Sequence, residues 1–182
     1  MLLGVVVWQV VVWSGEISQK NRRYKAAVSC SRMLGKPLLV AGGPWSNRGI
    51  RRWLHMPAHG GGDVCLDIER RAFEGHPGGV VADVTQIPFC NKAFGAVFAS
   101  HLLEHLPSIY YANMALDELN RVAEVVLLVY PSRQSIAAWL HHGHHLWIWQ
   151  KDNVLYIEQR GHSTSEKSAT YPVIDAVKEM LR

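Results

Sequence analysis

The sequence predicts an α/β fold in which a mostly parallel sheet lies between two layers of helices. Short apolar runs recur along the chain, and several are continuous rather than alternating, as is typical of strands covered on both faces. A clear helical segment separates the last two runs, and strand–helix–strand repeats favour right-handed parallel units. The length of 182 residues fits one domain with a sizeable core. The runs are at 38–41, 63–66, 79–82, 95–100 and 125–130.

The first 13 residues are almost wholly apolar, and only Gln9 interrupts them. A 13-residue helix spans about 20 Å, which is less than the roughly 30 Å of a bilayer's hydrocarbon core. Trp8 and Trp13, followed by basic residues at 20–25, are typical of an anchor at a membrane edge. The alternatives are a buried strand or core helix end, and a start-site artefact. We therefore divide the chain into an apolar segment (1–15), an amphipathic helix (16–36) and an α/β domain (37–182).

Three helices and a hairpin are predicted beside the apolar runs. The helix over 16–34 ends before Gly35 and Pro37, which favour termination. A second helix follows Ser108, whose hydroxyl can cap it, and carries an apolar stripe at Ile109, Ala112, Leu116, Leu119 and Ala123. Residues 145–149 and 153–158 flank a polar turn and predict an antiparallel hairpin. A polar loop (161–170) and a final helix (171–182) complete the prediction.

Charge and cysteine content exclude few functions. The net charge is +4, and a modest positive charge is only a weak sign of an anionic partner. Basic clusters could bind nucleic acid, but the sequence contains no recognisable nucleic-acid-binding motif, so we do not expect such a partner. The clusters are Arg22, Arg23 and Lys25, and Arg48, Arg51 and Arg52. The three cysteines are far apart, which disfavours a disulfide framework or a cysteine-rich zinc site and predicts reduced thiols.

Candidate ligand-binding residues follow the predicted strands, because ligands of open α/β sheets bind beyond the carboxyl ends of the strands. The first strand ends in a glycine turn, Gly42 and Gly43, where a ligand can approach the backbone closely. Asp67 ends the second strand and could accept hydrogen bonds from ribose hydroxyls; Asp83 ends the third and could accept one from an adenine amino group. A local cap or turn is the alternative role for each aspartate.

The stretch from Ala82 to Val97, followed by Ser100 to Leu106, resembles class I S-adenosylmethionine-dependent methyltransferases, closest to the ubiquinone- and menaquinone-biosynthesis type (methyltransferase type 11). The pattern consists of an aspartate, a short gap, Ile87-Pro88-Phe89, a polar turn, Phe94 and the ending Leu103-Glu104-His105. The resemblance covers roughly residues 37–131. It implies a Rossmann-like three-layer sandwich that binds S-adenosylmethionine and methylates a small-molecule or lipid-like acceptor.

The resemblance also implies roles for single residues. Gly42 and Gly43 would lie under the methionine part of the cofactor, and Asp67 would hold the ribose, with Ile68 against the adenine. Asp83 and Val84 would face the adenine ring, whereas Ser100 and His101 would lie near the sulfonium. A general base helps when the acceptor carries a proton, and His101 is the candidate ahead of His105.

Departures from the family pattern keep a second function open. Val40 replaces the usual acid, Pro44 and Ser46 replace two glycines, and Gly95 replaces an aspartate. A membrane-tethered protein that binds the cofactor without turnover is therefore the alternative. A nicotinamide-dependent oxidoreductase is disfavoured, since no G-x-G-x-x-G follows the first strand. We expect a cytoplasmic location, with membrane association through residues 1–13.

A histidine-rich segment, 141–145, suggests a metal site at first sight. Zinc sites usually require Cys or further His at set spacing, and the sequence shows none, so we predict no metal and assign the segment to a solvent-facing or substrate-covering loop. Trp139, Trp147 and Trp149 could form an apolar wall over the acceptor or pack in the core. The short C-terminal part leaves little room for a separate substrate domain.

Overall fold

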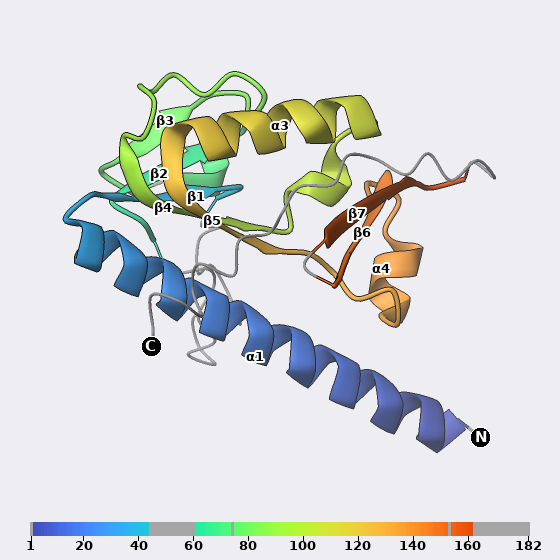
Figure 1. Cartoon of the computed structure of the whole chain (residues 1–182). Helices are drawn as coiled ribbons and strands as arrows, with labels where there is room; N and C mark the ends of the chain where they lie inside the picture. Colours follow the sequence, from blue (N-terminus) through green and yellow to red (C-terminus); the bar gives the residue numbers. More distant parts are fainter. Residues whose placement is uncertain (1, 44–60, 74, 153, 162–182) are drawn as a thin grey trace.

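Five parallel strands form one sheet in the order β3-β2-β1-β4-β5 (Figure 1). The structure is a computed structural model that describes residues 2–43, 61–73, 75–152 and 154–161. Each predicted apolar run overlaps one strand, with starts that differ by up to two residues. The Rossmann-like α/β sandwich with a parallel sheet is confirmed. The strands are β1 (Leu38–Ala41), β2 (Val64–Asp67), β3 (Gly79–Val81), β4 (Phe94–Ser100) and β5 (Ala123–Val129).

The sheet is covered on both faces, which explains the continuous apolar runs. Side chains alternate along each strand, so neighbouring residues enter different apolar clusters. Val40 and Phe98 belong to the cluster under α1 (Leu2–Leu34), and Leu39 and Val97 belong to the cluster under α3 (Ile109–Val122). The sheet is therefore the middle of three layers (Figure 1).

Helix α1 is continuous from Leu2 to Leu34, so the apolar segment and the amphipathic helix form one element. Its C-terminal half packs on the sheet: Ala27 and Cys30 are buried there, and the Tyr24 ring meets Phe98 edge-on at 5.3 Å between centroids. A 33-residue helix is about 50 Å long, roughly twice the length of the longest strand. Since α1 ends at the edge where β1 begins, its N-terminal half extends beyond the carboxyl edge of the sheet (Figure 1).

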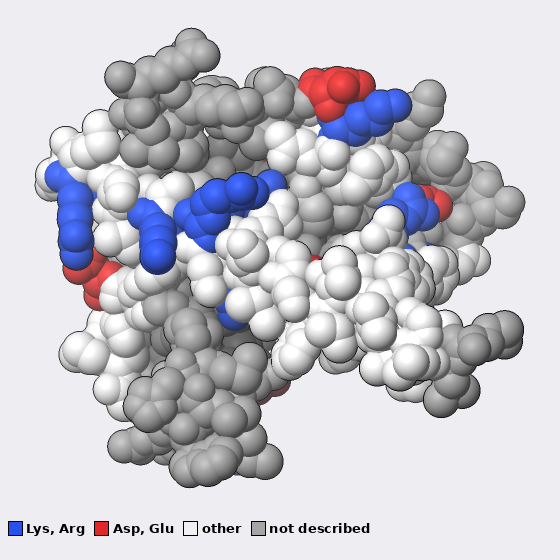
Figure 2. Space-filling model, turned by 90° about the horizontal axis from the view of Figure 1, so that it is seen from below, with Lys and Arg blue, Asp and Glu red and all other residues white. Residues whose placement is uncertain are grey.

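The N-terminal half of α1 exposes its apolar side chains. Among them are Leu3, Val11 and Trp13, each more than half exposed, which contradicts the alternative of a buried strand or core helix end. Within the described residues, no helix has both the length and the apolar character that crossing a bilayer requires. Basic side chains gather over the other half of the helix, seen from below in Figure 2. In this half, the basic residues Arg22, Lys25 and Arg32 are exposed, whereas Arg23 reaches inward and donates to the Leu128 carbonyl.

Polar contacts attach α1 to the chain that follows β5. The Glu16 carboxylate accepts a hydrogen bond from the Ser132 N–H at 2.7 Å, and Gln9 bonds the backbone at Gln134 (3.0 Å) and Ile136 (2.9 Å). The short helix α4 (Ile136–Leu140) begins at this contact. The N-terminal half of α1, here called the overhanging half, therefore lies on the side of the sheet where the strands end.

The C-terminal elements partly match the prediction. Strands β6 (Leu146–Lys151) and β7 (Val154–Gln159) form the expected antiparallel hairpin, separate from the main sheet. Ser108 is the N-cap residue of α3, but its side chain makes no capping hydrogen bond, which differs from the predicted cap. The predicted final helix (171–182), the loop at 162–170, and Pro44, Ser46, Arg48, Arg51 and Arg52 lie outside the described residues.

Gly95 lets α1 approach the start of β4. A Cβ atom at Gly95 would lie 2.9 Å from the Ser31 Cα and 3.2 Å from the Lys36 Cβ. Contacts below 3.0 Å to backbone atoms require a shift of the backbone. The helix end and the turn into β1 therefore occupy the space that a side chain at this position would need.

Substituting Gly95→Ala should lower the free energy of unfolding by about 1–3 kcal/mol, because the added methyl overpacks the contact between α1 and β4. Gly15→Ala in α1 is the matched control: its Cβ would meet nothing within 4 Å, and alanine raises helix stability by up to about 1 kcal/mol. Urea unfolding of both variants measures the difference. Equal stability of Gly95→Ala and the wild type would contradict the close packing described above.

Candidate functional site

The predicted ligand-binding residues meet along one edge of the sheet. The strand register pairs Ala41 with Leu66 and with Ala99, and pairs Asp67 with Val81, so the carboxyl ends of four neighbouring strands are level. In the order β3-β2-β1-β4, the residues at or after these ends are Asp83, Asp67, Gly42 and Ser100. Strands β2 and β3 are added on one side of β1, and β4 and β5 are added on the other, so the strand order reverses between β1 and β4, where ligands of such folds bind.

The turn after β1 needs glycine for two reasons. Gly42 and Gly43 have φ values of 88° and 96°, in the left-handed region that side chains rarely adopt. In addition, a Cβ at Gly42 would lie 3.3 Å from the Leu102 Cβ. The Gly42 N–H donates to the Leu66 carbonyl at 2.9 Å, which ties this turn to β2. The glycines thus bring the ends of β1, β2 and β4 close together.

Both aspartates make local turn contacts with one carboxylate oxygen. The Asp67 Oδ1 accepts from the Glu69 N–H at 2.8 Å, and the Asp83 Oδ1 accepts from the N–H and hydroxyl of Thr85, both at 2.8 Å. A carboxylate has two oxygens, so these turns are compatible with ligand binding. Asp67 is half-buried, and desolvation raises its pKa above the ordinary value. Among their neighbours, Val84 is buried, whereas Ile68 is exposed.

His101 is held beside a buried carboxylate. Its Nδ1 lies 3.2 Å from the Glu104 Oε1, and Glu104 is 1% exposed. His101 adopts a φ of 53°, which is uncommon for a residue other than glycine and occurs often at functional sites. The buried Ser100 Oγ and Glu104 Oε2 have no hydrogen-bond partner. Unsatisfied buried polar atoms are costly, so this end of β4 is suited to a polar ligand.

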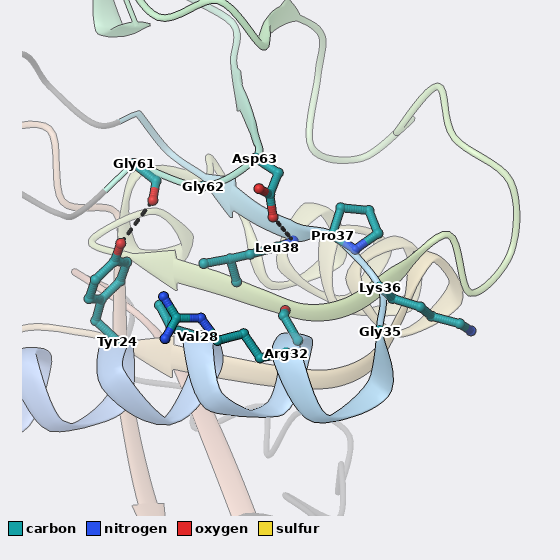
Figure 3. Close-up of a pocket in the computed structure, with 11 residues that line it drawn as sticks. Tyr24, Val28, Arg32, Gly35, Lys36, Pro37, Leu38, Gly61, Gly62 and Asp63 are labelled. Atoms are coloured by element: carbon teal, nitrogen blue, oxygen red, sulfur yellow. Dashed lines mark hydrogen bonds between the residues drawn. The ribbon is translucent and has the colours of Figure 1, made fainter.

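The open hollow shown in Figure 3 lies at the other edge of the sheet. It has a volume of about 600 Å³, and its lining includes Tyr24, Arg32, Lys36, Leu38 and Asp63. Leu38 begins β1 and Asp63 precedes β2, so this is the amino edge of the sheet. The hydrogen bonds drawn there, Tyr24 hydroxyl to the Gly61 carbonyl (2.8 Å) and Leu38 N–H to the Asp63 Oδ2 (2.7 Å), connect protein groups to each other. None of the predicted ligand-binding residues lines this hollow.

A histidine cluster lies next to the end of β4. One ring nitrogen from each of His105, His141 and His144 lies within 4.8 Å of those from the other two. Sequence reasoning recognised the segment 141–145 but missed His105, because no spacing in the sequence relates residue 105 to that segment. Desolvation lowers the pKa of His144 from 6.5 to about 4, and the neighbouring His105 and His141 contribute in the same direction, against Glu104. His144 is therefore neutral at physiological pH.

Arginine side chains lie over the tryptophan rings of α4 and the hairpin. The Arg133 guanidinium lies 4.7 Å from the Trp149 ring centroid, and the Arg160 guanidinium lies 4.7 Å from that of Trp147. Trp139 and Trp147 are 4.7 Å apart between centroids. Trp147 is buried, while Trp139 is 54% exposed. A role for these rings in contacting an acceptor stays a prediction.

Comparison with known proteins identifies part of the chain. Residues 63–125, about a third of the chain, match the family model of a methyltransferase domain. No curated protein matches. Among solved structures, the N-methyltransferase NodS from Bradyrhizobium japonicum WM9 is similar over 82% of this chain and 92% of its own. The sequence identity is 12% and the TM-score is 0.39. The family match spans β2 to the start of β5, including Asp67, Asp83 and His101, and confirms over residues 63–125 the resemblance to class I S-adenosylmethionine-dependent methyltransferases.

Proposed function

We propose that this protein transfers a methyl group from S-adenosylmethionine to a small-molecule or lipid-like acceptor. The methyltransferase-domain match supports S-adenosylmethionine-dependent methylation in general. The observation that carries the proposal is the row of Asp83, Asp67, Gly42 and Ser100, which lie at or just beyond the level carboxyl ends of adjacent parallel strands. A polar ligand the size of adenosine needs hydrogen-bond acceptors, a backbone that it can approach closely, and a buried polar group at one end of its site. The two aspartates, Gly42 and Ser100 supply these three features.

Residues of the row fit the parts of the cofactor. The second oxygen of the half-buried Asp67 carboxylate is suited to the ribose hydroxyls, and the Gly42–Gly43 turn admits the methionine part without side-chain obstruction. Asp83, Ile68 and Val84 would surround the adenine. The orphaned Ser100 Oγ and the neighbouring His101 would lie near the sulfonium. When bound, S-adenosylmethionine supplies an electrophilic methyl group.

His101 is the catalytic residue in this proposal. Its ring would accept the proton that a hydroxyl, amine or thiol acceptor loses, and the contact with the buried Glu104 fixes the ring orientation. Glu104 acts through His101 and is a positioning residue. Methyl transfer otherwise depends on holding the acceptor in line with the methyl group.

The exposed apolar side chains in the overhanging half of α1 favour an apolar methyl acceptor. Its exposed apolar side chains extend beyond the carboxyl edge, the same side as the row of candidate residues. Figure 2 shows basic side chains along the remainder of the helix, and such an arrangement suits the headgroup region of an anionic membrane. In this proposal, α1 places the site at a membrane surface, where a lipid-like acceptor would be available.

A second candidate function is cofactor binding without turnover, and Val40 favours it. Val40 occupies the family's acidic position, is 1% exposed and belongs to the apolar cluster under α1. A valine supplies no carboxylate to the cofactor's ammonium group, which weakens one expected contact. Binding without methylation of any acceptor in a broad screen would support this candidate.

Substituting Asp67→Asn should weaken binding of S-adenosylhomocysteine about 10- to 100-fold in calorimetric titration, because the charged acceptor for the ribose is lost. Asparagine keeps the acceptor for the Glu69 N–H.

The same substitution should not lower the stability of the fold. Burial raises the Asp67 pKa, so the contribution of this carboxyl to the free energy of unfolding falls as the pH rises through that pKa. At neutral pH, Asp67→Asn should therefore unfold at the same or a higher temperature than the wild type. Asp152→Asn, an exposed change in the hairpin turn, is the matched control and should leave binding unchanged. Failure of the wild type to bind at millimolar ligand would refute the proposal.

With an acceptor identified in the screen, His101→Gln should lower kcat about 10²- to 10⁴-fold, since it removes the general base. The loss should be smallest for acceptors that are deprotonated at the assay pH, a dependence that a merely structural role would not produce. His76→Gln, at the amino edge of the sheet, serves as the control. Unchanged kcat in His101→Gln would exclude the residue as the base.

A further inference from the structure

Three imidazoles from separate parts of the chain gather around one point. His105 ends the 3₁₀ turn Leu103–His105 after β4, whereas His141 and His144 lie between α4 and β6. The ring centroids are 4.3 to 5.3 Å apart, and one nitrogen of each ring lies within 4.8 Å of the others. A tetrahedral zinc site needs ligand nitrogens about 3.3 Å apart. The rings of His141 and His144 are stacked at an interplanar angle of 22°, so binding one ion requires a rotation of at least one of these side chains.

We propose that His105, His141 and His144 form a binding site for one divalent transition-metal ion, with Zn²⁺ as the expected occupant. Three neutral imidazoles are a common protein ligand set for zinc and leave a fourth position for water or substrate. This replaces the sequence-based expectation of no metal, which depended on the absence of a third ligand near residues 141–145.

One of the rings is oriented as metal ligands usually are. The His105 Nδ1 lies 2.9 Å from the Gly143 carbonyl, to which it donates, so its Nε2 carries the lone pair. Ligating histidines typically donate their other ring N–H to a carbonyl or carboxylate in this way. The His144 Nδ1 is buried and has no hydrogen-bond partner, which leaves this atom available to an ion. His141 accepts a long hydrogen bond from the Gly143 N–H (3.2 Å), which it would exchange for the ion.

The loop that carries two of the ligands is fixed in place. The Arg160 guanidinium donates to four carbonyls at 2.7 to 3.2 Å: those of Ala138 and Trp139 in α4, and those of His141 and His144 in the loop. The His145 N–H donates to the Glu104 carbonyl at 2.7 Å, which joins the loop to the turn that carries His105. A preorganised ligand set loses less entropy when the ion binds.

A buried acidic side chain lies beside the cluster. Glu104 directly precedes His105 in the chain, is 1% exposed, and has no hydrogen-bond partner for its Oε2. A buried polar atom without a partner is costly. A divalent ion held by the three imidazoles would stabilise this side chain electrostatically. Glu104 also contacts His101, so the ion would be one residue removed from the candidate base.

Metal binding is tested by titrating the full chain, prepared without affinity-tag histidines and treated with a chelator, with Zn²⁺ in a calorimeter. The titration contains no S-adenosyl compound, so its outcome is independent of the proposed methyl transfer. We expect about one ion per chain, and Co²⁺ should give the visible absorption bands of a tetrahedral complex. His141→Ala and His144→Ala should each weaken binding about 10- to 100-fold or more.

His142→Ala is the matched control, because His142 is an exposed neighbour outside the cluster, and it should bind Zn²⁺ like the wild type. Circular dichroism checks the folding of each variant. If the partly buried His144 proves necessary for folding, the exposed His141 still provides the test. Well under one ion per chain, or equal weakening by His142→Ala and His141→Ala, would overturn the proposal.

Discussion

The candidate site depends on the parallel arrangement of the five strands. Parallel strands joined by crossovers all end at the same edge, so residues far apart in the sequence become neighbours without any long loop. The register makes the ends of β1 to β4 level, and the Gly42–Gly43 turn then permits the close approach of the chain after β4. The same edge brings the β4 exit, with His101 and Glu104, beside the histidine loop. The proposed cofactor site and the proposed metal site therefore both result from the parallel arrangement of the strands.

Helix α1 explains two departures from the methyltransferase pattern. Val40 faces the apolar layer that α1 covers, where an unpaired carboxylate would be costly. Gly95 lies directly under the end of α1 and has no room for the aspartate found in the family. In this protein, one long N-terminal helix covers the sheet and also extends past the candidate site. Val40 and Gly95 therefore both lie in the packing between α1 and the sheet.

The sequence was sufficient for the sheet and for much of the candidate site. Runs such as 95–100 predict strands because both faces are covered, and Asp67 and Asp83 could be placed because parallel strands share a carboxyl edge. The continuity of α1 was not predictable, since the apolar pattern changes character near residue 15. The histidine cluster was also beyond sequence reasoning. The approach of His105 to His141 depends on the 3₁₀ turn, the Arg160 contacts and the hairpin together.

The most direct test of the account is a two-dimensional amide NMR spectrum of the ¹⁵N-labelled chain, recorded with and without S-adenosylhomocysteine. It distinguishes the carboxyl edge of the sheet from the hollow at the amino edge. If the cofactor binds at the carboxyl edge, the largest shift changes will occur at the strand ends, in Gly42, Gly43, Asp67, Asp83 and Ser100. Changes centred on Tyr24, Gly61 and Asp63, or no saturable change at all, would contradict the account.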